Sequence, residues 1–212
     1  MEHITSTSSA EELSVQVINT AVQDAEKNGA LSTSEFATHV EKMSAASGME
    51  TPETARYISA LRNVSHDATV GALPEGIGGQ FDGEVTIATS TLEVGSEGIE
   101  KTIAQMQEVD RHEAYHALNQ HLEPLQTVDG SGMVVIAGEE FSTTEVIEGL
   151  TVSETGNVFV SDGYRQHEDE VTSAIAEAGL SRDDLRRAVN DEKDLTQIDD
   201  RARQQKQFAM AA

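Results

Sequence analysis

A glycine-rich break divides this chain into parts that must fold differently. The stretch GALPEGIGGQ, residues 71–80, combines several glycines with a proline, so no regular helix can run through it. Before the break the apolar residues recur at helical spacing, and after it strand and helix patterns alternate. We therefore predict three parts: an N-terminal helical unit (1–70), an α+β domain (71–178) and a C-terminal helical extension (179–212).

Local stop and start signals place the helices of the first part. Asn28-Gly29 ends a helix predicted over 11–27, and Ser32 with Glu35 predicts a capping box for the next one. Thr51-Pro52 opens a third helix, because proline is favoured at the first helical position. These signals predict a unit of three helices.

The second part mixes strands with helices. Residues 81–89 (FDGEVTIAT) alternate apolar and polar side chains, which predicts one half-buried strand, and MVVIA at 133–137 predicts a buried strand. A long helix is expected over 96–121, and a further helix starts at a capping box of Ser142 and Glu145 and ends at Gly156. The tail from about residue 191 is charged and poorly patterned, so we expect it to fray or extend.

Composition narrows the function classes. The 212 residues carry a formal net charge of −24, which repels nucleic-acid backbones and anionic membrane surfaces, so neither is an expected partner. No cysteine is present, so a transition-metal site must use histidine and carboxylate ligands. The first residues have no basic leader, and no stretch is as long and apolar as a membrane span, so we expect a cytoplasmic protein.

The sequence HEAYH at 112–116 carries the sharpest chemical signal. His112 and His116 are four residues apart, so on a helix both imidazoles point from one face towards a single ion. Glu113 projects close to that face, where it can take a proton from a water that attacks a carbonyl group. The competing interpretation is an exposed helix face whose histidines bind nothing.

A catalytic zinc needs a third protein ligand and an open position. His121 lies nine residues after His112 and points to the opposite side of a continuous helix, so we exclude it.

From the strand at GGQFDGEVTIA through HEAYH to EVIEGLT at 145–151, the chain resembles the gluzincins, and especially the small members called minigluzincins. The resemblance covers about residues 77–178. It implies a zincin-like core, made of a small sheet, an active-site helix and a glutamate helix, and a zinc-dependent peptidase acting on a peptide or protein substrate laid along the strand at 85–89.

By the same resemblance, zinc is bound by His112, His116 and Glu148, and Glu113 is the general base. Glu145 lies one turn before Glu148 and stays the alternative ligand. Tyr164 is the candidate donor to the developing oxyanion. The sequence departs from the family pattern at Val152, where a second acidic residue is expected.

Residues 24–35 (DAEKNGALSTSE) also fit the outline of a calcium-binding EF-hand loop, although the two helix-end signals explain the same residues. The alternative function is therefore a non-catalytic protein, either zincin-like or calcium-binding through this loop. A further hypothesis is that the N-terminal helices cover the cleft as an inhibitory segment, hinged at the glycines of 76–79.

Overall fold

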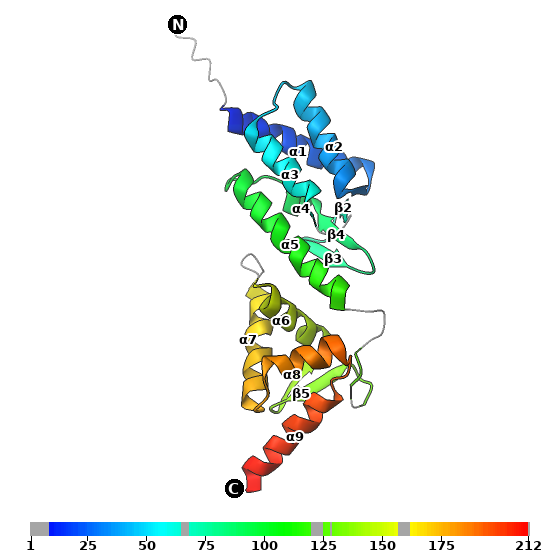
Figure 1. Cartoon of the computed structure of the whole chain (residues 1–212), viewed down its shortest axis with the longest axis vertical. Helices are drawn as coiled ribbons and strands as arrows, with labels where there is room; N and C mark the ends of the chain where they lie inside the picture. Colours follow the sequence, from blue (N-terminus) through cyan, green and yellow to red (C-terminus); the bar gives the residue numbers. More distant parts are fainter. Residues whose placement is uncertain (1–8, 65–67, 120–124, 128, 157–161, 212) are drawn as a thin grey trace. The chain divides into compact units, whose positions relative to one another are not determined.

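The computed structural model describes residues 9–64, 68–119, 125–127, 129–156 and 162–211, which form a mixed α+β protein (Figure 1). The chain divides into two compact units, Met1–Ala114 and Tyr115–Ala212. The division falls inside one helix, so it coincides with neither boundary predicted from the sequence, at 70 and at 178. Within the described residues, no helix has the length and apolarity to cross a membrane.

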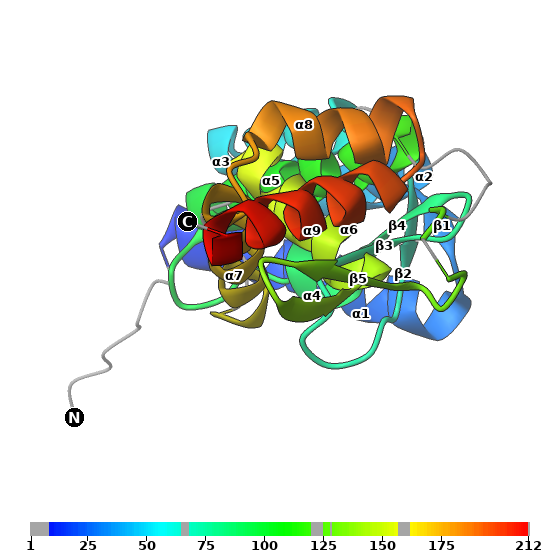
Figure 2. The same ribbon diagram turned by 90° about the horizontal axis from the view of Figure 1, so that it is seen from below.

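The first unit combines helices with one small sheet. Its elements are α1 (Ala10–Asn28), β1 (Leu31–Ser32), α2 (Thr33–Ala46), α3 (Pro52–Arg62), β2 (Thr69–Gly71), β3 (Gly79–Phe81), β4 (Val85–Ala88), α4 (Thr89–Leu92) and the start of α5 (Ile99–Asn119). The strands lie in the order β1-β2-β4-β3. All four strands are labelled in Figure 2. β2 and β4 run parallel, and the other two pairs are antiparallel.

The predicted caps of the N-terminal helices are confirmed. The Ser32 hydroxyl accepts the Glu35 N–H and the Glu35 carboxylate accepts the Ser32 N–H, which starts α2. Thr51 caps α3 with Pro52 at the first helical position. Each cap satisfies N–H groups that a helix start would otherwise leave unpaired.

The stretch predicted as one strand over 81–89 is instead a hairpin. β3 ends at Phe81, which pairs with Val85 at the start of β4, and Gly83 turns the chain with a φ of 106°. Asp-Gly is a favoured turn pair, because glycine adopts positive φ without steric cost. The alternation of apolar residues therefore crosses a turn.

The N-terminal helices are an integral part of the first unit rather than a separate covering segment. The Asn19 side chain exchanges two hydrogen bonds with the backbone of Val94, at 3.0 and 2.8 Å. The Tyr57 hydroxyl donates to the Leu92 carbonyl at 2.7 Å in the buried interior. Because β1 also pairs with β2, the sheet and these helices form one structure. The hypothesis of a hinged inhibitory segment is not supported.

The second unit is built on a two-stranded sheet covered by helices. Its elements are the end of α5, β5 (Met133–Ile136), β6 (Glu139–Ser142), α6 (Thr143–Thr155), α7 (Asp162–Glu177), α8 (Arg182–Arg186), the π-helix η1 (Arg187–Asp191) and α9 (Thr196–Ala211). The apolar run at 133–137 is confirmed as a strand, β5, with Val134 and Ile136 fully buried.

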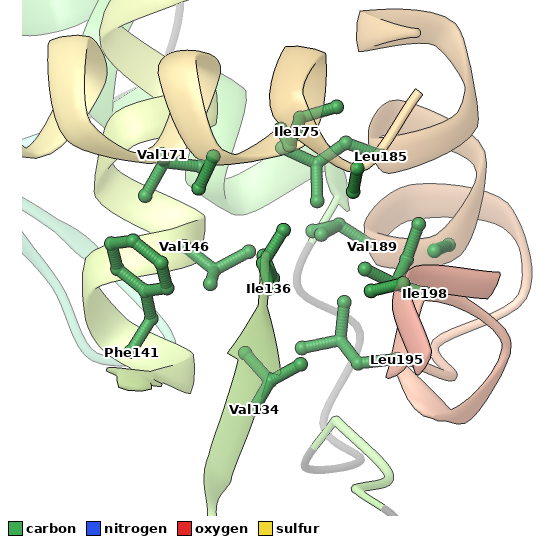
Figure 3. Close-up of a cluster of buried hydrophobic side chains, with 14 of the residues drawn as sticks. Val134, Ile136, Phe141, Val146, Val171, Ile175, Leu185, Val189, Leu195 and Ile198 are labelled. Carbon is green, nitrogen blue, oxygen red and sulfur yellow. The ribbon is translucent and has the colours of Figure 1, made fainter. Parts of the chain in front are cut away.

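The C-terminal segment belongs to the core of this unit. Val134, Ile136 and Val146 pack with apolar side chains from α7, α8, η1 and α9 and with Leu195, which directly precedes α9 (Figure 3). The helical residues of this cluster include Val171, Ile175, Leu185, Val189 and Ile198. The expectation that the chain frays or extends from about residue 191 is therefore wrong for the start of α9: the helix begins at Thr196, and Leu195, Ile198 and Ala202 are buried. The Asp199 carboxylate also accepts the N–H of Val135 at 2.8 Å, which fixes α9 to strand β5.

Candidate metal centre

Helix α5 buries an unusual number of ionisable side chains. Glu108, Asp110, His112, Glu113 and His116 are all at most 8% exposed. Burying a charged group is unfavourable unless it is paired or bound to a metal ion. HEAYH therefore does not lie on an exposed helix face, as the competing interpretation expected.

Three side chains lie close enough together to hold a metal ion. One ligand atom each of His112, His116 and Glu148 lies within 4.8 Å of the other two. His116 Nε2 and Glu148 Oε2 are 3.3 Å apart. A tetrahedral zinc with ligands at about 2.0 to 2.1 Å separates neighbouring ligand atoms by about 3.3 to 3.4 Å. This donor set of two imidazoles and one carboxylate could therefore hold a metal ion.

The geometry distinguishes Glu148 from Glu145, which the sequence left open. The Glu145 carboxylate accepts the Ser142 N–H at 2.6 Å, and the Ser142 hydroxyl accepts the Glu145 N–H at 3.1 Å. These bonds to Ser142 hold the pKa of Glu145 below its ordinary value. Glu145 is thus committed to capping α6, and Glu148, one turn later, is the glutamate that reaches the histidines.

Close packing of α6 on α7 fixes the position of Glu148. A Cβ atom on Gly149 would lie 2.9 Å from the carbonyl oxygen of His167, so only glycine lets the two backbones approach this closely. The neighbouring Val146 and Leu150 are buried in the core of the second unit. The helix that carries Glu148 is therefore held on both sides of this residue.

Glu113 lies directly against strand β3. A Cβ atom on Gly79 would be 3.0 Å from both Cγ and Oε1 of Glu113 and 2.5 Å from Cγ1 of Val109. Among the described strands, β3 pairs with β4 alone, so it forms an edge of the sheet. The strand at 85–89, expected to hold the substrate, is flanked by β2 and β3 and has no open edge. The edge strand beside Glu113 is β3, which the alternating sequence pattern does not distinguish from β4.

The remaining predicted residues lie in defined places. Tyr164 is half-buried on α7, with its ring edge-on to His167 at a centroid distance of 6.3 Å. Val152, which stands where the family pattern has an acid, is buried on α6. His121, excluded as a ligand from the sequence, lies outside the described residues.

The loop considered for calcium is organised by helix ends. Its residues Asp24, Glu26 and Asn28 are still within α1. The Glu26 carboxylate accepts the Thr89 hydroxyl, while the Glu35 carboxylate caps α2. These contacts favour the capping interpretation of this segment over calcium binding.

Comparisons with protein-family models, with curated proteins and with solved structures find no match to this chain. The assignment of a function therefore rests on the residues and geometry described above.

Proposed function

We propose that this protein is a zinc-dependent metallopeptidase of the gluzincin type, in which His112, His116 and Glu148 bind the metal and Glu113 is the general base. The observation that carries the proposal is the convergence of the three ligands beside a buried Glu113. The resemblance of residues 77–178 to the gluzincins is its second support.

The donor set suits zinc and leaves a coordination position for water or substrate. Two neutral imidazoles and one carboxylate are the protein ligands of several catalytic zinc sites, whereas structural sites use four. Within the described part of the chain, three ligand side chains converge. When bound, zinc supplies Lewis acidity and lowers the pKa of a coordinated water to about 7.

Glu113 performs the proton transfers in this proposal. It follows His112 directly, so its carboxylate projects beside the metal-binding face of α5 rather than into it. There it accepts a proton from the attacking water and delivers it to the leaving amine. Burial keeps bulk water from competing for this position.

An extended peptide is the substrate that the first unit fits best. The outer edge of β3 offers backbone groups for strand addition, and Gly79 of the same strand packs against Glu113. A peptide added to β3 therefore lies beside the general base. Tyr164 remains the proposed donor to the oxyanion.

The test separates binding from turnover. Glu113→Gln should keep zinc and lose hydrolysis of fluorogenic peptides, because an amide cannot act as base. His116→Ala should lose both. Glu100→Gln, an exposed position on the same helix, is the matched control and should keep both. If Glu113→Gln hydrolyses peptides as fast as the parent, Glu113 is not the base. If the parent binds zinc but cleaves nothing, the non-catalytic alternative replaces this proposal.

A further inference from the structure

Tyr115, inside the HEAYH motif, is bonded to a residue far away in the sequence. The Asn190 side-chain amide donates to the Tyr115 hydroxyl at 2.8 Å. Both residues belong to the second unit. Tyr115 directly precedes His116, so this bond joins the turn of α5 that carries a proposed metal ligand to the C-terminal part of the chain.

The backbone around Asn190 is firmly held. Asn190 lies in η1, where the N–H of Glu192 donates to the Arg187 carbonyl at 2.9 Å in a π-helical turn. Ala188 and Val189 of the same turn are buried in the core of the second unit. Single π-helical turns are rare and often occur at functional sites, because they redirect a side chain without ending the helix.

The amide of Asn190 is not explained by local stability. Its oxygen Oδ1 is buried and accepts no hydrogen bond from the described residues. Burying a carbonyl oxygen without a hydrogen bond is unfavourable, so the side-chain NH₂ of Asn190 is expected to make an interaction that offsets this cost. The interaction that this NH₂ group makes is the hydrogen bond to the Tyr115 hydroxyl.

We propose that Asn190 is a positioning residue for the metal centre, acting through Tyr115 to fix the rotation of α5; this inference rests on the proposed metal site. The Tyr115 hydroxyl lies far from the axis of α5, so a hydrogen bond that holds this hydroxyl in place limits rotation of the last turns of the helix. His116 is thereby kept facing Glu148, at the 3.3 Å separation that a shared ion requires.

The experiment measures zinc affinity by chelator competition for the parent, Tyr115→Phe, Asn190→Ala and the double variant. Residues that orient metal ligands typically change metal affinity by about 10-fold to 100-fold when replaced. We expect each single variant to lose about 10-fold. The double variant should be no weaker than either single one, because both remove the same hydrogen bond. Tyr115→Phe keeps the ring and its packing, so it remains a fair test if Asn190→Ala folds poorly.

Tyr57→Phe is the matched control. It removes a tyrosine hydroxyl bond of 2.7 Å in the buried interior of the first unit. It should lower the melting temperature without changing zinc affinity. Affinities of Tyr115→Phe and Asn190→Ala within about twofold of the parent, or effects that multiply in the double variant, would overturn the positioning role alone. A parent that binds no zinc would overturn this role together with the metal centre.

Discussion

Replacing Gly79 by alanine tests the contact between the edge strand and the proposed base. The new methyl group would lie 2.5 Å from Cγ1 of Val109 and 3.0 Å from Cγ and Oε1 of Glu113. Carbon atoms in contact normally stay about 3.5 to 4.0 Å apart, so strand and helix must separate by about 1 Å. Val109 cannot easily yield, because a β-branched side chain in a helix is confined to one rotamer.

The expected magnitude follows from that displacement. Forcing a methyl group into a packed contact costs about 1 to 3 kcal/mol of unfolding free energy. A displacement of about 1 Å between substrate and catalytic groups lowers the rate by about 10²-fold. Because the nearest side chains are Val109 and Glu113 rather than the three ligands, we expect zinc content to be unchanged.

The assay compares kcat/KM on fluorogenic peptides, zinc content and melting temperature for Gly79→Ala and the parent. Gly95→Ala is the matched control, since a Cβ atom there meets nothing within 4 Å. It should behave like the parent in all three measurements. A folded Gly79→Ala variant with parental kcat/KM would refute the assignment of β3 as the strand that places substrate beside Glu113.

Four further predictions concern three residues of the second unit. Gly149→Ala should lower both stability and zinc affinity, because its methyl group would press on the His167 carbonyl and move α6; thermal melting and chelator competition measure the two effects. Asp199→Ala should lose about 1 to 3 kcal/mol in urea unfolding by leaving the Val135 N–H unpaired, whereas Asp199→Asn should lose less, because its oxygen can still accept. Burial raises the pKa of the Asp199 carboxyl, so this group stabilises the folded state most at pH values below its ordinary pKa. The stabilisation declines as the pH rises through the raised pKa. Asp199→Asn should flatten this decline when melting temperature is measured against pH. Hydrogen bonds from Ser181, which caps α8, lower the pKa of the Asp184 carboxyl to about 2. The stability of the folded protein should therefore fall as the pH drops from about 4, the ordinary pKa of this group, towards 2. The fall should be less steep in Asp184→Asn.

Features with local causes could be predicted from the sequence. The capping box of Ser32 and Glu35 involves residues three apart, and their hydrogen bonds form whatever the rest of the chain does. The pairing of His112 and His116 on one face follows from helical periodicity alone. These parts of the fold and the site appear in the structure as expected.

Features that depend on a choice between competing local signals are harder to predict from the sequence. The pattern of residues 81–89 suits a strand, yet the turn at Gly83 prevails because an Asp-Gly pair closes a hairpin readily. Glu145 and Glu148 both suit a ligand on a helix near the histidines. The Glu145 carboxylate is bound in the cap at Ser142, and the capping box that the sequence predicts already implies this.

Features that depend on distant contacts left no signal in the sequence. Tyr115 and Asn190 are 75 residues apart, and neither has a neighbour that marks the pair. The tail appears too polar for a core, yet Leu195, Ile198 and Ala202 are enough to pack the start of α9 on the second unit. Such contacts are set by tertiary packing, which overrides weak local patterns.

The most direct test of the metal centre is elemental analysis of purified protein dialysed against zinc, for the parent and for His116→Ala, Glu148→Ala and Glu145→Ala. The proposal predicts one zinc ion per parent chain, little or none in the first two variants and a full complement in Glu145→Ala, whose carboxylate serves the helix cap. A parent chain without zinc, or zinc retained when Glu148 is replaced, would contradict the proposed centre.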